Sequence, residues 1–149
     1  MESLKGKLTN SLLNIYRLDF VSTLGDFLYG EQAVLFNLSI IKDSDIGTIG
    51  ENSNISKSRM SAVIKSLLRK KYITIKNDPK DKRKKIVILS KTGQMYINEK
   101  LIEAEQILND CISKMGKEKT KELIDLLDYM SERMGFNGTD KISQSIENL

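Results

Sequence analysis

The residues that could bind a charged ligand are gathered in one stretch of this 149-residue chain. Between Lys57 and Lys85 there are twelve lysines and arginines but only two acids, Asp78 and Asp81, so the stretch has a net charge of +10. The rest of the chain has twelve basic and eighteen acidic residues, a net charge of −6. A basic stretch flanked by acidic ones is typical of a module that binds a polyanion such as a nucleic acid.

The densest part of this charge lies in a turn, residues 77–84, that contains the only proline of the chain, Pro79. Strand-like runs rich in β-branched residues flank the turn, Tyr72–Lys76 before it and Lys85–Leu89 after it, and predict a β-hairpin. The cations at its tip and exit are Lys80, Lys82, Arg83, Lys84 and Lys85. A lysine-rich turn alone is more often a solvated loop than a binding site, so the neighbouring elements must decide between the two interpretations.

An amphipathic helix precedes the hairpin. The spacing of Met60, Val63, Ile64, Leu67 and Leu68 predicts a helix from Lys57 to about Lys70 with one apolar stripe. Ser56 is the expected N-cap, and Ile55 and Met60 the expected hydrophobic staple. The other face has small and hydroxyl side chains near its start and cations further along, as expected of a helix that enters the major groove of DNA. The candidate DNA-binding residues are therefore Ser56, Lys57, Ser58, Arg59, Ser61, Ala62, Lys65 and Arg69 on the helix and Lys80, Lys82, Arg83 and Lys84 on the hairpin.

Helical periodicity accounts for the other elements. We expect one helix over residues 4–28 with an irregularity near Gly25, a second from about Gln32 to Asp43, and a short third from Asp45 to Ser53, followed by a left-handed turn at Asn54. After the hairpin, Ser90 or Thr92 should cap a long helix whose apolar seam runs from Ile97 to Met115. A last helix should present apolar residues from Leu123 to Met134, and the chain from Asn137 should be polar and frayed.

The segment "ISKSRMSAVIKSLLRKKYITIKNDPKDKRKKIVILSKTG", residues 55–93, resembles the MarR family of bacterial transcription regulators. Asp78, Pro79, Asp81 and Arg83 match the family's wing tip, Leu89, Ser90 and Gly93 match the exit from the wing, and Leu28, Gln32 and Leu35 match its second helix. The chain departs from the pattern at Lys71, where glycine is usual, at Ala62, where arginine is frequent, and in the more polar third helix, "TIGENSN".

The resemblance implies a mainly α fold with a small β-hairpin wing (α+β), a winged helix-turn-helix domain with N- and C-terminal dimerisation helices. We expect a single domain over residues 1–149, with the DNA-binding lobe at 30–90, dimerisation helices at 1–29 and 91–135, and a tail at 136–149. The resemblance also adds Asp81 to the candidate DNA-binding residues, because in such a wing it would brace Arg83 for entry into the minor groove.

The predicted function is sequence-specific binding of double-stranded DNA by a homodimer on a palindromic operator, most simply as a repressor. The alternative is a winged-helix protein that binds DNA or RNA without sequence preference. An enzyme is disfavoured because the chain has no histidine and one cysteine, which removes the commonest metal ligands and nucleophile–histidine pairs. A pure interaction adaptor is disfavoured by the concentrated basic surface. We expect no cofactor, no metal, no membrane association and a cytoplasmic location.

The resemblance further implies release from DNA by a small phenolic or lipophilic effector. Tyr16, Phe20 and Phe36 are candidate lining residues for its cavity, although aromatic residues of this kind are more often plain core. Cys111 lies on the seam of the long helix, where a buried hydrophobic role is a simpler interpretation than redox sensing.

Overall fold

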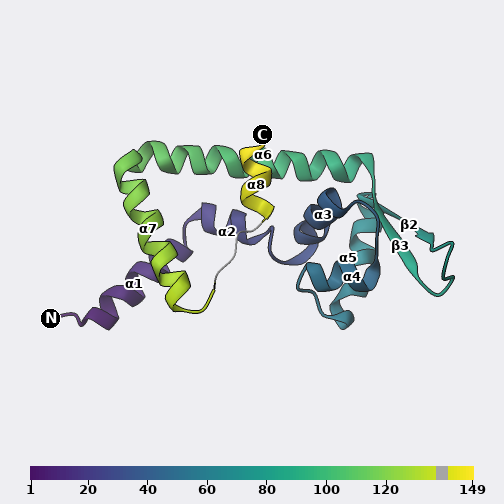
Figure 1. Cartoon of the computed structure of the whole chain (residues 1–149), viewed down its shortest axis with the longest axis horizontal. Coiled ribbons are helices and arrows are strands. Elements are labelled where there is room, and N and C mark those ends of the chain that lie inside the picture. The colour runs from purple at the N-terminus through teal and green to yellow at the C-terminus, as the bar shows by residue number, and fades with distance from the viewer. Residues whose placement is uncertain (137–140) are drawn as a thin grey trace. The chain divides into compact units, whose positions relative to one another are not determined.

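The computed structural model describes residues 1–136 and 141–149 and divides the chain into two compact units, Met1–Lys100 and Leu101–Leu149. The first unit contains the predicted helix-turn-helix and hairpin (Figure 1). The second contains the remainder of the long helix and the two helices after it. No helix in the described ranges is both long enough and apolar enough to cross a membrane.

The N-terminal segment forms two helices, so the prediction of one helix over residues 4–28 was wrong. Helix α1 runs from Leu4 to Tyr16 and α2 from Asp19 to Gly25. Leu18 between them has an extended backbone, with ψ of 134°. Asp19 is in the first turn of α2, where a carboxylate is favourable beside the free N–H groups.

The helix-turn-helix comes next along the chain. Helix α3 (Gly30–Ile41) is joined by a two-residue strand, β1 (Ser44–Asp45), to α4 (Ile46–Asn52), and α5 (Lys57–Arg69) completes the motif. Helices α4 and α5 match the predicted ones to within two residues at each end. Strand β1 was not predicted.

The wing belongs to a three-stranded antiparallel sheet with the strand order β1-β3-β2. Strands β2 (Ile73–Asn77) and β3 (Lys85–Leu89) form the predicted hairpin, with Ile75 opposite Val87. On its other side β3 pairs with β1, which places Ser44 opposite Val87. Strand β3 is therefore hydrogen-bonded along both edges, and this joins the wing to the body of the domain.

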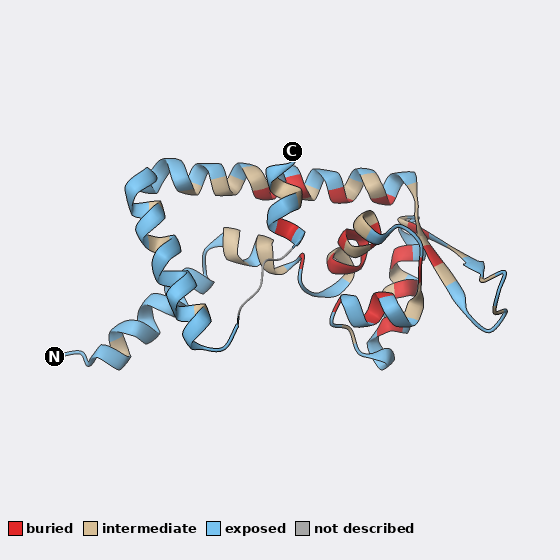
Figure 2. Ribbon diagram, viewed as in Figure 1, coloured by how far each residue is buried: buried red, intermediate tan, exposed pale blue. Residues whose placement is uncertain are grey.

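The core of the first unit is formed by the inward-facing side chains of its helices and strands. Buried side chains come from α3, α4, α5, both long strands and the start of α6, as the red segments of Figure 2 show. On α5 the buried residues are Met60, Ile64 and Leu67, three members of the predicted stripe. This burial holds α5 in place by one face only and leaves the opposite face to solvent.

Helix α6 (Lys91–Met115) begins in the first unit and continues into the second, which also contains α7 (Lys117–Arg133) and α8 (Lys141–Glu147). Along the predicted seam of α6, Ile97, Leu101 and Ala104 are buried and Met115 is exposed. The prediction of a frayed tail was wrong for Lys141–Glu147, which is helical and has Ile142 buried. The remainder of that prediction, residues 137–140, lies outside the described residues.

Candidate nucleic-acid interface

The turn that leads into α5 is fixed by local bonds. Asp45 caps α4, its carboxylate accepting from the Thr48 backbone N–H at 3.0 Å and from the Thr48 hydroxyl at 2.7 Å. Asn54 has φ of +54°, the predicted left-handed conformation, and the Ile55 N–H donates to the Gly50 carbonyl at 2.9 Å. These bonds determine the direction in which α5 leaves the turn.

Ser56 occupies the predicted N-cap position of α5, but its side chain does not make the expected capping bond. Its hydroxyl lies 3.1 Å from the hydroxyl of Ser58 instead. Both residues are exposed at the first turn of the helix. The start of α5 therefore offers a pair of hydroxyl groups to a ligand rather than a closed cap.

Every helix residue proposed for DNA binding is exposed, and the outer face of α5, opposite Met60, contains Ser58, Ala62, Lys65 and Arg69. With about 100° of rotation per residue, Ser58 and Ala62 each lie roughly 160° around the helix from the buried Met60. Lys65 and Arg69 continue this outermost line toward the C-terminus. Exposed residues of the candidate surface on the helix are Ser56, Lys57, Ser58, Arg59, Ser61, Ala62, Lys65 and Arg69. The small side chains are thus at the start of this face, with the cations of Lys65 and Arg69 beyond them.

The C-terminal end of α5 has a left-handed residue, Lys71, at the position where the sequence departs from the family pattern. Lys71 has φ of +61°, its N–H donates to the Leu68 carbonyl, and the Tyr72 N–H donates to the Leu67 carbonyl, both at 3.0 Å. This pair of bonds is the Schellman motif, which usually has glycine at the left-handed position. Ser90, at the start of α6, donates its hydroxyl to the Lys71 carbonyl at 2.6 Å. The end of α5 is therefore tied directly to α6.

An ion pair holds the same end of α5 to α3. Lys70 Nζ lies 2.6 Å from Glu31 Oε2. Partial burial raises the pKa of Glu31, but hydrogen bonds from Lys70 and Ser66 and the charges of Lys70 and Arg69 outweigh it, so the pKa lies below its usual range. The same hydrogen bond has the opposite effect on its donor and raises the pKa of Lys70. Both groups are charged near neutral pH, and sequence alone did not predict the pair.

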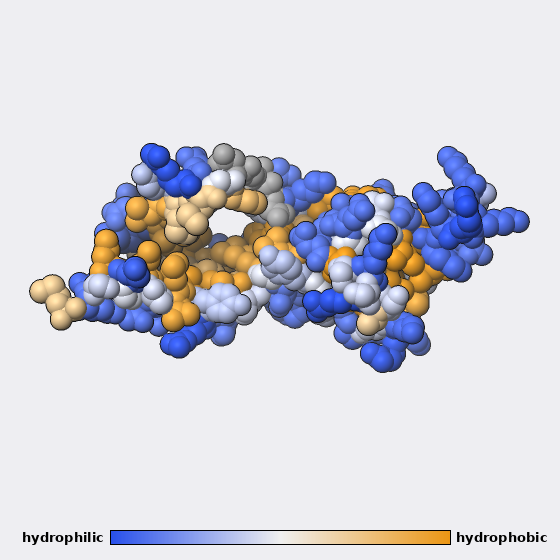
Figure 3. All heavy atoms as spheres, turned by 90° about the horizontal axis from the view of Figure 1, so that it is seen from below, coloured by the Kyte–Doolittle hydropathy of each residue, from blue (hydrophilic) through white to orange (hydrophobic). Residues whose placement is uncertain are grey.

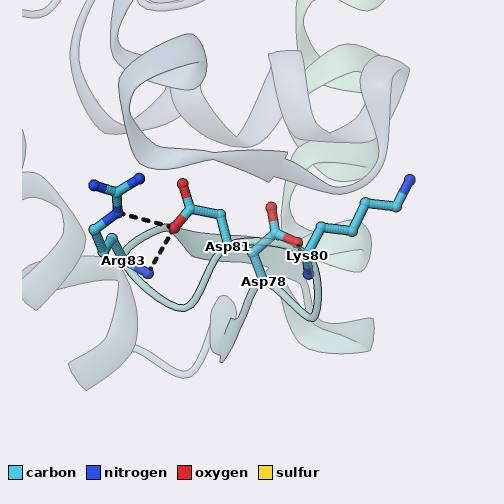
Figure 4. A network of polar contacts seen from close by, with 4 residues as sticks. All are labelled: Asp78, Lys80, Asp81 and Arg83. Carbon is cyan, nitrogen blue, oxygen red and sulfur yellow. Dashed lines mark hydrogen bonds and ion pairs between the residues drawn. The ribbon is translucent and has the colours of Figure 1, made fainter.

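The wing tip is ordered by two aspartates (Figure 4). Asp78 Oδ1 accepts from the Lys80 N–H at 2.8 Å. Asp81 Oδ1 accepts from the Arg83 N–H at 3.1 Å and from Arg83 Nε at 3.2 Å. These bonds from Arg83 lower the pKa of Asp81. Asp81 thus holds Arg83 by Nε, while the arginine side chain remains 92% exposed.

The other cations of the wing differ in their surroundings. Lys85 Nζ donates to Asn77 Oδ1 at 3.1 Å, across the two strands. Lys84 lines a hollow of about 240 Å³ with Asp45, Arg83 and Lys85, beside the start of β3. Hydrogen bonds from Thr48 lower the pKa of Asp45, and the charge of Lys84 contributes to the same shift. Lys84 is therefore close enough to Asp45 for the two charges to interact.

All thirteen candidate DNA-binding residues lie in the first unit. Each is exposed except Asp81, which is half-buried. Hydrophilic side chains cover the outer end of the hairpin (Figure 3), and Figure 1 shows this hairpin extending beyond the helices next to α5. The structure thus brings the basic helix and the wing into one compact unit.

The three aromatic candidates for an effector cavity differ in their surroundings. Phe36 is buried and packs edge-to-face on Phe27, with ring centroids 5.5 Å apart, as a core residue does. Tyr16 is exposed and lines a hollow of about 510 Å³, whereas Phe20 and Phe36 are not among its lining residues. The lining residues are Tyr16, Val21, Ser22, Leu24, Gly25, Asp26, Leu28 and Tyr29. Of the aromatic candidates only Tyr16 contributes to this hollow.

The described part of the chain shows no cluster of residues that could bind a metal ion. Within residues 1–136 and 141–149 no three or more Cys, Asp or Glu side chains are grouped so that they could hold a metal ion. Cys111 is half-buried, and its sulfur contacts that of Met115 at 3.8 Å.

No protein-family model matches the chain, and no curated protein does. Solved structures do match. The PcaV transcriptional regulator of Streptomyces coelicolor superimposes with a TM-score of 0.69 at 19% identity, over 89% of this chain and 98% of that one. MarR of Staphylococcus aureus, in complex with salicylate and kanamycin, gives a TM-score of 0.65 at 20% identity, over 88% and 92% of the two chains.

A MarR-like transcriptional regulator of Thermotoga maritima gives a TM-score of 0.63 at 21% identity, over 92% of this chain and 99% of that one. At such identities the similarity establishes the fold. The chain therefore has the winged helix-turn-helix fold of MarR-type regulators, and the fold expected from residues 55–93 is confirmed.

Proposed function

We propose that this protein is a DNA-binding transcription regulator that binds an inverted-repeat operator in the cytoplasm as a homodimer and acts as a repressor. The observation that carries the proposal is the pairing, in one compact unit, of an exposed basic helix with a wing whose arginine is braced by Asp81. The net charge of +10 between Lys57 and Lys85 supplies the attraction to phosphates that DNA binding requires.

The two surfaces suit the two grooves of DNA. The small outward side chains of Ser58 and Ala62 let the backbone of α5 approach base edges in the major groove, and Lys65 and Arg69 are placed one and two turns further on, toward phosphates. Arg83 suits a narrow, electronegative minor groove. We assign DNA contact to the thirteen residues named above, with Asp81 acting through Arg83.

The homodimer is supported by α1 and α7. Neither helix has a buried residue, although both contain several leucines, of which Leu126 is 67% exposed. Soluble proteins rarely leave large apolar faces uncovered. A second copy, related by a two-fold axis, would cover the same faces on both subunits and would present two α5 helices to half-sites about 34 Å apart.

Binding to a pool of random duplexes tests this function. The full-length protein should enrich an inverted repeat and prefer it by ~10³ or more over unrelated DNA at fixed salt. Equal affinity for all duplexes, with only a steep salt dependence, would instead support a protein that coats nucleic acid without sequence preference. Arg83→Ala should weaken operator binding by roughly 10- to 100-fold and leave the helix content unchanged.

Sedimentation tests the dimer separately. We expect twice the mass of the chain for the wild type and a shift toward the monomer for Leu126→Glu. A wild-type monomer at concentrations that saturate the operator would refute the two-fold arrangement.

A small phenolic or lipophilic effector is proposed for the hollow lined by Tyr16, Leu24 and Tyr29. Its volume of about 510 Å³ is within the usual range for small-molecule sites. Salicylate, present in the Staphylococcus aureus MarR structure, is the first probe. It should release the operator complex of the wild type at a lower concentration than that of Tyr16→Ala; equal release would remove this hollow from the mechanism.

A further inference from the structure

We propose that Ala62 reads the C5-methyl group of a thymine in each half of the operator, so that thymine content in the major groove determines where this protein binds. The inference rests on the proposed function, and it names the base that the centre of α5 recognises. It depends on which side chains the outward face of this helix contains and which it lacks.

In the first two turns of α5 the residues most nearly opposite the buried Met60 are Ser58 and Ala62. Both are exposed, and each lies on the opposite side of the helix from Met60, which is 3% exposed. A major-groove reader needs its recognition groups at this place, because the N-terminal half of the helix comes nearest to the base edges.

The neighbouring cations lie either to the side of this line, as Lys57 and Arg59 do, or further along it, as Lys65 does. Arg59 belongs to the flank of α5 that borders a hollow of about 200 Å³ shared with Tyr29, Asn54 and Val63. Lys57 is about 100° around the helix from Ser58, and Lys65 is almost a full turn beyond Ala62. The centre of the reading face is therefore formed by a hydroxyl group and a methyl group.

Each base prefers a different partner in the major groove. Guanine is read by the long donors of arginine or lysine, adenine by asparagine or glutamine, and cytosine by a carboxylate, whereas the thymine methyl group is contacted by apolar groups such as the alanine methyl. Helix α5 contains no Asn, Gln, Asp or Glu between Lys57 and Arg69. Ser58 can hydrogen-bond to several bases, so the selective contact left at the centre is methyl to methyl.

The side chain of Ala62 is also short enough for this contact. A thymine methyl group projects into the groove, so the helix backbone must come close for an alanine to touch it. The small residues Ser58, Ser61 and Ala62 on consecutive turns permit that approach. The contact would exclude water from two methyl groups in each half-site.

The test replaces thymine by deoxyuridine, which removes only the C5-methyl group. In duplexes selected from a random pool by the full-length protein, we expect one thymine in each half-site whose replacement lowers affinity roughly fourfold, the factor that corresponds to burying one CH₂-sized group. Replacement at both half-sites together should lower affinity roughly 15-fold.

Ala62→Gly identifies the protein partner of that methyl group. In this variant the thymine and uracil duplexes should bind equally, while the dependence of binding on salt stays as in the wild type. Ser66→Gly is the matched control, because it also places a glycine in α5 but at a half-buried position on another side. It should retain the full preference for thymine even if overall affinity falls.

Two results would overturn the inference, and they are distinguishable. If the selected sites tolerate uracil at every thymine, or if Ala62→Gly keeps the wild-type preference, the assignment of Ala62 fails and sequence-specific binding stands. If the selection enriches no sequence at all, the proposed function fails as well.

Discussion

Gly93 offers the sharpest test of how the DNA-binding unit is held together. A Cβ atom at this position would lie 2.1 Å from the Tyr72 carbonyl oxygen and 2.8 Å from Leu89 Cδ1. Non-bonded heavy atoms ordinarily lie at least about 3.5 Å apart. In Gly93→Ala the backbone around Tyr72 or α6 must therefore move by more than about 1 Å. The Tyr72 carbonyl cannot move freely, because it accepts the Ser90 N–H at 2.9 Å.

The loss of stability in Gly93→Ala can be bounded from these contacts. Overpacking of this kind costs about 1–3 kcal/mol. The hydrogen bonds from Ser90 to the carbonyls of Tyr72 and Lys71 contribute about 1 kcal/mol each if the shift breaks them. We therefore expect Gly93→Ala to lower the free energy of unfolding by about 3–5 kcal/mol, a large share of the roughly 5–15 kcal/mol typical of a domain.

Urea denaturation at one fixed protein concentration measures this loss, since dimer formation would make the stability concentration-dependent. Gly25→Ala is the matched control: nothing lies within 4 Å of its added methyl group, and as a helical position it should be unchanged or up to about 1 kcal/mol more stable. A Gly93→Ala protein within about 0.5 kcal/mol of the wild type would refute the reasoning.

Three further predictions concern the ends of α5 and the wing. Lys71→Gly should raise the unfolding free energy by about 0.5–1 kcal/mol, measured by urea denaturation, because φ of +61° is strained for lysine and free for glycine. Glu31→Gln should cost about 0.5 kcal/mol at pH 7, since both side chains of the pair with Lys70 remain partly exposed to solvent. The pKa of Glu31 is lowered, so its contribution is present above about pH 4.3 and is lost as the pH falls through the folded-state pKa; the stabilities of wild type and variant should converge as the pH falls through that range. Asp81→Ala should weaken operator binding roughly threefold to tenfold in a mobility-shift assay, less than loss of Arg83 itself, because the arginine keeps its charge but loses its orientation; an unchanged affinity would show that the brace is dispensable.

Features that depend on a few neighbouring residues were predictable from sequence. The left-handed turn at Asn54, the hairpin and the helix that begins after Ser90 each have a local chemical signal, and each is present. The stripe from Met60 to Leu67 predicted which face of α5 is buried because helical periodicity alone determines it.

Features that join distant segments were not predictable. Strand β1 is two residues long and exists because Ser44 pairs with Val87, and Glu31 meets Lys70 across 39 positions of sequence. The break at Leu18 was missed because apolar residues continue at helical spacing through it, and spacing does not report the extended backbone there. For the candidate site, the sequence was enough to predict which residues could contact DNA. The hydrogen bonds of Arg83 and the position of Arg59 on the flank of α5 could be described only from the fold.

The hydrogen bond from Arg83 Nε to Asp81 determines which amino acids position 83 can tolerate. A guanidinium group has two usable edges, and here one is bonded to the protein while the side chain as a whole remains open to solvent. Lysine carries the same charge on one nitrogen atom, which would have to serve both the internal acceptor and the external ligand. A charge-conserving lysine at the tip would therefore keep the attraction to phosphates and lose the fixed orientation, so geometry rather than charge restricts this position to arginine.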